Sequence, residues 1–224
     1  MKPIQALVLA AIAAPAAAQI TLVPGATDTG LTAFNAVGSE QRGNYKSYLE
    51  DADGLSTRLQ GNTISTQWWV NTERSWEVVW DDSTETVTFN IYSDNAYTNL
   101  ADSISRSLSL GGNSLVNLNI GARIVDAEHS VTFSGVEFDG GSGFAAVPSA
   151  NATYTGNGFY TNFHTLAGPR GDFTLRGVSL LADSVDSITS TSDRFRFFVV
   201  AQTPAPGSLA LLGLGGLAAT RRRR

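Results

Sequence analysis

Period-two alternation of apolar and polar residues recurs along most of this 224-residue chain. Val87, Phe89 and Ile91 alternate with threonine and asparagine, as expected where successive side chains point to opposite faces of a strand. Helical spacing is scarce, and little room remains for the crossover helices of a parallel sheet. We therefore predict an all-β fold, an antiparallel and jelly-roll-like β-sandwich. Further alternating segments lie at 116–120, 131–134, 173–176 and 194–199.

Turn signals add local detail to this pattern. The aromatic segment 76–80 is joined to 87–91 by the polar cluster Asp81–Thr84, which predicts a β-hairpin. Gly111-Gly112-Asn113 predicts a turn before the next strand. Aromatic and β-branched residues at 68–70 predict one more strand, and we expect a short helix within 95–108.

Charge is unevenly distributed along the chain. Five of the 15 basic residues are Lys2 and Arg221–Arg224, in terminal segments that contain no Asp or Glu. The body between these segments therefore has 10 basic residues against 20 acidic ones. Such a balance argues against nucleic acid or anionic lipid as a partner. The absence of cysteine excludes disulfides and thiolate chemistry.

The first 18 residues have the pattern of a secretory signal peptide. Lys2 gives a positive start, 4–14 form an apolar run, and Ala16–Ala18 supply the small residues of a cleavage site. We place the cleavage between Ala18 and Gln19. The secretion machinery is therefore an expected partner of the chain.

The C-terminal segment 204–224 has three parts in order. Pro204-Ala205-Pro206 precedes the uncharged stretch 207–220, which ends at Arg221, Arg222, Arg223 and Arg224. As a helix, this stretch would measure about 21 Å, short of the roughly 30 Å hydrocarbon core of a bilayer. We expect a short hydrophobic helix that inserts transiently in the inner membrane, with its arginines on the cytoplasmic side. The body, 19–203, would then lie outside.

This order of parts resembles the PEP-CTERM sorting signal, with Ala205 in the position of the eponymous Glu. The resemblance implies an exosortase-type processing enzyme and a secreted or cell-surface location, in an exopolysaccharide-rich extracellular matrix. The Trp-rich hairpin and the strand Gly171–Leu175 make the body similar to the choice-of-anchor domains, the W type in particular. That second resemblance brings no catalytic residues with it.

Residues that could carry out catalysis do not form a recognisable pattern. His129 and His164 stand alone without metal-binding spacing, so we interpret both as surface or turn residues. Gly141-Ser142-Gly143 lacks the elbow of a serine hydrolase. A glycosidase needs two facing carboxylates, but most acidic residues here suit turns or solvent. The candidates are Asp51, Asp53, Asp81, Asp82, Glu137 and Asp139.

A calcium site is the one cofactor alternative that we weigh. Asp51-Ala52-Asp53-Gly54 has the alternating carboxylates and glycine of an oxygen-ligand loop, but Gln60 stands where an EF-hand has its glutamate. We favour an ordinary Asp-Gly turn. We therefore predict no cofactor and no metal ligand.

All four tryptophans lie between residues 68 and 80. Trp76, Val78 and Trp80 share one face of a strand and are expected in the core. Trp68 and Trp69 point opposite ways in a strand, so one of them is a candidate ligand-facing ring that could stack on a sugar.

These observations support three hypotheses. The first is an exported, non-catalytic protein of the cell surface or extracellular matrix. The second is a carbohydrate-binding module for extracellular polysaccharide. The third is a glycoside hydrolase with a carboxylate pair.

Overall fold

The computed structural model describes residues 19–25, 30–41, 44–51, 56–59, 71–125, 127–183 and 194–204. Within these ranges the protein is all-β, apart from one 3-10 turn, η1 (Pro148–Ala150). All strand pairings among the described residues are antiparallel, and the strands form two sheets. The predicted antiparallel sandwich is confirmed.

Each sheet has seven strands, and we name them sheet A and sheet B. Sheet A has the order β1 (Thr21–Pro24), β12 (Gly158–Ala167), β8 (Asn117–Ile124), β14 (Arg194–Pro204), β2 (Gly30–Gln41), β3 (Asn44–Asp51) and β4 (Ser56–Leu59). Sheet B has the order β10 (Ala145–Ala146), β9 (His129–Asp139), β13 (Phe173–Asp183), β5 (Arg74–Asp81), β6 (Thr86–Tyr92) and β7 (Leu100–Ser107), and β11 (Ala152–Thr155) also pairs with β9.

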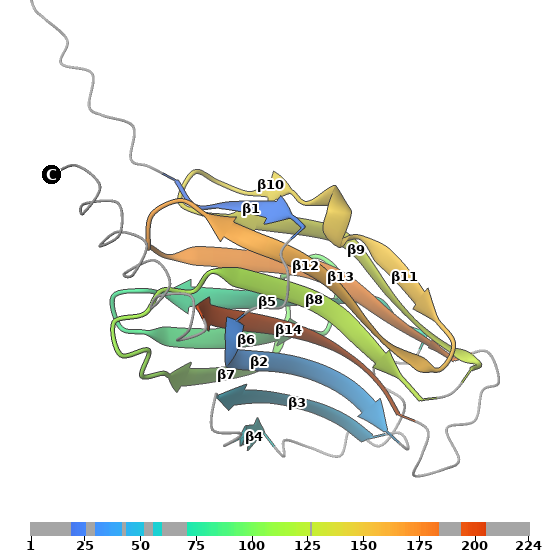
Figure 1. Ribbon diagram of the computed structural model, residues 1–224. Helices are drawn as coiled ribbons and strands as arrows, with labels where there is room; N and C mark the ends of the chain where they lie inside the picture. Colours follow the sequence, from blue (N-terminus) through green and yellow to red (C-terminus); the bar gives the residue numbers. More distant parts are fainter. Residues whose placement is uncertain are drawn as a thin grey trace, which may run out of the picture.

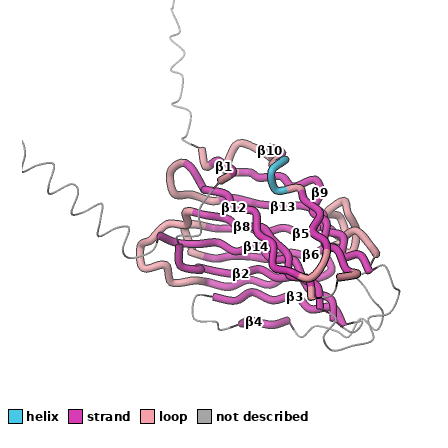
Figure 2. Tube along the Cα trace, turned by 45° about the vertical axis from the view of Figure 1, so that its right-hand side comes forward, coloured by secondary structure: helices cyan, strands magenta, loops and turns pink. Residues whose placement is uncertain are grey.

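The two sheets lie one behind the other, with their strands running in similar directions (Figures 1 and 2). β12 and β8 lie in front of β9, while β3 lies near β7 at the opposite side. A hydrogen bond of 2.6 Å from the buried Ser47 hydroxyl of β3 to the Asp102 carboxylate of β7 joins the sheets there. Strands far apart in the sequence thus become neighbours across the sandwich.

The core is filled by one face of most strands, as the alternation predicts, whereas β8 is buried on both faces from Asn117 to Ala122. In β5, Trp76, Val78 and Trp80 are buried between the sheets, which confirms their expected place in the core. Burying apolar side chains of this size stabilises each by roughly 1.5–3 kcal/mol relative to exposure. This burial fixes the register, because a slip of one residue would turn every core side chain towards solvent.

Four aromatic rings meet near the middle of the sandwich. The ring of Phe197 from sheet A lies 5.7 Å from Trp76, 6.3 Å from Phe89 and 5.9 Å from Phe133, all from sheet B. The contacts with Phe89 and Phe133 are edge-to-face, an arrangement that adds favourable quadrupole interactions to the burial. This aromatic cluster joins the two sheets.

Most of the strands expected from alternation are present. β5 and β6 form the predicted hairpin, with Trp76 opposite Ile91 and Trp80 opposite Val87. Gly111 and Gly112 have φ angles of +58° and +83°, which suit a turn at the predicted place. β8, β9, β13 and β14 cover the other alternating segments.

The prediction of a short helix within 95–108 is wrong, because this segment contains the edge strand β7 (Leu100–Ser107). Leu100, Ile104 and Leu108 are four residues apart, a spacing typical of a helix. In the strand only Ile104 of the three is fully buried, and Leu100 is 56% exposed. The intervening serines instead bond to the outer face of β6, as in the 2.8 Å contact of Ser105 with Thr88. Serine is also unfavourable in the interior of a helix, because its hydroxyl competes for backbone hydrogen bonds.

We predict that Phe197→Ala lowers the free energy of unfolding by about 3–5 kcal/mol, because it leaves a cavity among the three facing rings. Urea denaturation of the variant would measure this loss. Leu100→Ala removes an exposed side chain from the edge strand β7 and serves as the control, with a change within about 0.5 kcal/mol. Equal stability losses in the two variants would contradict the central role of the aromatic cluster.

Candidate functional site

The end of β14 is the part of the predicted sorting tail that the structure describes. The Gln202 side chain is buried and accepts a hydrogen bond of 3.3 Å from the Asn117 amide of β8. Thr203 is also buried, and Pro204 pairs with Gly30 of β2. A proline suits this position, where the strand ends and the missing N–H breaks no central ladder. The first residue of the Pro-x-Pro motif therefore belongs to the folded body.

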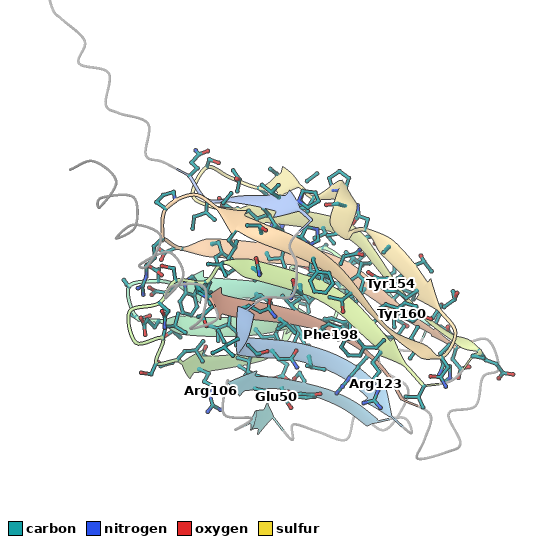
Figure 3. The ribbon with its side chains drawn as sticks, viewed as in Figure 1. Glu50, Arg106, Arg123, Tyr154, Tyr160 and Phe198 are labelled. Carbon is teal, nitrogen blue, oxygen red and sulfur yellow. The ribbon has the colours of Figure 1, made fainter. Side chains whose placement is uncertain are left out.

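The outer face of sheet A presents the aromatic pair Phe159 and Phe198 beside two arginines, Arg123 and Arg196. Figure 3 labels Phe198 and Arg123. Phe159 of β12 is 66% exposed, and its ring stacks on the Phe198 ring of β14 at 4.9 Å with 20° between the planes. Arg123 of β8 stands directly opposite both Phe159 and Arg196 in the strand register. Gly121 makes room for this stack, because a Cβ there would lie 2.5 Å from the Phe198 ring.

The outer face of sheet B also carries an arginine with aromatic neighbours. Arg176 of β13 donates two hydrogen bonds, of 2.9 and 2.7 Å, to one carboxylate oxygen of Glu137. Its guanidinium carbon lies 3.5 Å from the centre of the Phe144 ring and 4.8 Å from that of Tyr97. Cation–π contacts of this kind hold both rings against the sheet. The charge of Arg176 is thus balanced within the protein.

The loop that carries Tyr97 is fixed by a single carboxylate. Asp94 accepts hydrogen bonds from the backbone N–H groups of Ala96, Thr98 and Asn99, at 3.1, 3.2 and 3.0 Å, and from the Thr98 hydroxyl. These bonds, that of the Thr98 hydroxyl foremost, lower the pKa of Asp94 to about 2. Tyr97 has a φ of +58° and donates its backbone N–H to the Ser75 hydroxyl.

The tyrosines over sheet B stay neutral at physiological pH. Burial raises the pKa of Tyr92 to about 12, and its hydrogen bond of 3.0 Å to the Glu77 carboxylate raises it as well. Burial also raises the pKa of Tyr97 to about 12. Glu77 in turn accepts a hydrogen bond from Asn90 at 3.3 Å. Tyr92 and Asn90 therefore both donate hydrogen bonds to the Glu77 carboxylate.

Both histidines are buried, so the expectation of surface or turn positions is wrong. His164 points inward from β12, and its Nε2 lies 3.1 Å from the Ser149 hydroxyl. His129 begins β9, with its Nε2 3.6 Å from the Asp183 carboxylate. These partners come from distant parts of the chain, which is why local sequence spacing did not reveal them.

The Ser149–His164 contact brings together a hydroxyl and an imidazole, two of the three groups of a serine hydrolase triad. Burial lowers the pKa of His164, which favours the neutral ring that a general base needs. A serine hydrolase also requires an acid on the other ring nitrogen. The buried Nδ1 of His164 has no hydrogen-bond partner in the described part of the chain.

Four of the six carboxylates considered for a glycosidase pair, Asp81, Asp82, Glu137 and Asp139, have hydrogen-bond or ionic partners among the described residues. Asp81 accepts hydrogen bonds from the backbone N–H groups of Ser83 and Thr84, at 2.9 and 3.1 Å. Asp139 does the same in the 139–143 turn, where its pKa is lowered by the N–H groups of Gly141, Gly143 and Ser142. Asp82 pairs with Arg170 at 2.7 Å, and Glu137 pairs with Arg176. The expectation that most serve turns is confirmed for Asp81 and Asp139.

A small cavity opens at one end of the sandwich, between Ile20, Trp80 and Arg170. Its volume is about 120 Å³. Sites for small organic ligands usually measure about 300 Å³ or more. The cavity is therefore a poor fit for a sugar ring.

Residues 202–224 match the PEP-CTERM protein-sorting motif. The chain carries a PEP-CTERM sorting motif. No curated protein matches the chain. The PEP-CTERM motif supports exosortase-type sorting of an exported, cell-surface or secreted protein. Its match begins at Gln202, so the motif overlaps the last three residues of β14.

Several predicted site residues lie outside the described residues. They are the cleavage residue Ala18, the motif residues Ala205 and Pro206, the arginines 221–224, the aromatic pair Trp68 and Trp69, and the loop residues Asp53 and Gly54. The hydrophobic helix expected within 207–220 also lies outside. Gln19, the residue after the expected cleavage, is exposed.

No helix within the described ranges is long and apolar enough to cross a bilayer. No group of three or more histidine, aspartate or glutamate side chains in the same ranges could hold a metal ion.

The residues on the outer face of sheet A were missed by the sequence analysis. One signal was present, because Phe198 interrupts the polar positions of the 194–199 alternation, where Arg194 and Arg196 precede it. An aromatic residue on an otherwise polar strand face favours an exposed contact surface. Its neighbours Phe159 and Arg123 could not be assigned without the strand order.

We predict that the loop around Asp94 loosens between about pH 4 and pH 2. The pKa of an unfolded aspartate is about 3.9, whereas that of folded Asp94 is lowered to about 2. The charged carboxylate therefore stabilises the loop fully above about pH 4, and this stabilisation is lost as the pH falls through about 2. The amide chemical shifts of Thr98 and Asn99 should titrate with a midpoint near 2. Asp94→Asn should abolish this titration, and a midpoint near 4 in the natural chain would contradict the assignment.

Proposed function

We propose that this is an exported, non-catalytic protein of the cell surface or extracellular matrix. It crosses the inner membrane behind its signal peptide, and an exosortase-type enzyme handles its tail. The observation that carries the proposal is the PEP-CTERM motif at the end of the chain, continuous with β14. The signal-peptide pattern of 1–18 supports the same route.

The hydrogen-bond and ionic partners of four carboxylates support a non-catalytic role. Asp81, Asp94 and Asp139 accept backbone hydrogen bonds in turns, and Glu137 neutralises Arg176. Strongly perturbed acids and bases that converge in a cleft are the usual mark of an active site. Asp81, Asp94 and Asp139 instead stabilise turns at the surface.

We predict that a chain ending at Pro204 accumulates in the growth medium, whereas the full chain stays with the envelope or matrix. The stop position matters, because Pro204 pairs with Gly30 and the truncation leaves β14 complete. Immunoblots of cell, envelope and medium fractions would measure the distribution. Protease resistance of the released protein would check that the body is folded.

A second variant tests the charged end of the tail separately. Replacement of Arg221–Arg224 by glutamine keeps the length of the chain and removes the basic cluster. We expect this variant to be sorted less completely than the natural chain. An unchanged distribution of the truncated chain would refute the sorting role of the tail.

Binding of extracellular polysaccharide is a second candidate function, favoured by Phe159. A 66% exposed phenyl ring, fixed by stacking on Phe198, offers a flat apolar surface of the kind that packs on sugar rings. We predict saturable binding of the exported protein on a glycan array. Phe159→Ala should reduce this binding about tenfold, and an array without any signal would refute the binding function.

A further inference from the structure

The two arginines on the outer face of sheet A form no ion pair with any carboxylate that the structure describes. Arg123 and Arg196 stand directly opposite each other on β8 and β14. Like charges in this position destabilise a sheet unless an anion lies between or near them. The described carboxylates form no ion pair with either arginine, whereas Arg170 and Arg176 both have one.

The contacts of the two guanidinium groups differ. Arg196 donates a hydrogen bond of 2.8 Å to the Tyr48 hydroxyl, and its buried Nε–H has no acceptor in the described part of the chain. Arg123 is exposed, and no side-chain hydrogen bond connects it to another described residue. Arg196 is thus held in place next to an arginine whose donors are open to solvent. This contrasts with the acidic balance of the body, 10 basic residues against 20 acidic ones.

The aromatic pair forms the second half of the surface. Phe159 stands opposite Arg123 on the neighbouring strand, and the Phe198 ring supports it across Gly121. Neighbouring strands are about 4.8 Å apart, so the row from Phe159 through Arg123 to Arg196 spans about 10 Å. The surface therefore combines an exposed ring face with two adjacent positive charges.

Glu50 of β3 forms no ion pair with Arg123 or Arg196 among the described residues. Glu50 lies towards the other side of the sheet, and Asn35 of β2 donates a hydrogen bond of 3.1 Å to it (Figure 3).

We infer that this surface binds a carboxylate-bearing sugar residue of an acidic polysaccharide. The inference rests on the proposed polysaccharide-binding function and names the class of its ligand. The Arg123 guanidinium presents paired N–H donors to the carboxylate, a strong charge-assisted contact. The exposed face of Phe159 packs on the apolar side of the sugar ring. An open sheet face, in place of a deep pocket, accommodates an extended polymer.

Two forms of one polymer test the inference on the exported protein. Polygalacturonate carries one carboxylate on each ring, and its methyl-esterified form has the same rings without the charge. Titration calorimetry would give the Kd for each. We expect the natural chain to bind polygalacturonate at least about tenfold more tightly than the ester. Arg123→Gln should abolish this preference, and Phe159→Leu should weaken binding of both forms.

Arg170→Gln is the matched control, because it removes the same charge at the end of the sandwich, away from this face. An equal loss in this control would overturn the site by showing a general charge effect. Equal affinity of the natural chain for both polymers would overturn the carboxylate preference and leave polysaccharide binding in place. Binding of neither polymer, together with a glycan array without signal, would refute both. Circular dichroism would confirm that each variant is folded.

Discussion

The fold depends on the burial of one aromatic cluster between the two sheets. Phe197 from sheet A contacts Trp76, Phe89 and Phe133 from sheet B, so neither sheet can shift without exposing these rings. In a chain without disulfides, this apolar contact holds the layers together. It also fixes which side chains of β5, β9 and β14 face outward. The surfaces available for binding are therefore determined by the core.

Sequence patterns predicted those features that depend on neighbouring residues. The hairpin of β5 and β6 follows from alternation around a polar turn, and the sorting motif is a linear signal at the end of the chain. The edge strand β7 was mistaken for a helix, because its apolar residues are four apart and one face of an edge strand tolerates serine. Alternation is a clear signal only where one whole face is buried.

The remaining features arise between residues that are distant in the sequence. His164 is buried because β12 points it inward, next to Ser149, and nothing near His164 in the sequence indicates this. Arg123, Phe159 and Phe198 form one surface only because β12, β8 and β14 are adjacent. That order is set by the packing of the whole sandwich. Patterns between neighbouring residues therefore do not reveal the strand order.

The two outer faces differ in how their charges are balanced. On sheet B, Arg176 is held by Glu137 and two aromatic rings, and Glu77 is bonded by Tyr92 and Asn90. Such a saturated network favours rigidity and leaves little free energy to be gained from a ligand. On sheet A, the Phe159 ring is exposed and Arg123 has no ionic partner in the described residues. The second face therefore has more to gain from an external anion.

The attachment of the tail to β14 has a mechanical consequence. β14 lies inside sheet A, paired with β2 from Arg194 to Pro204 and with β8 from Phe195 to Gln202. A pull on the tail along the strand axis loads both hydrogen-bond ladders at once, in shear. An edge strand would instead be peeled away one bond at a time. If the protein is held at this end against fluid flow, both hydrogen-bond ladders of β14 would therefore carry the force together.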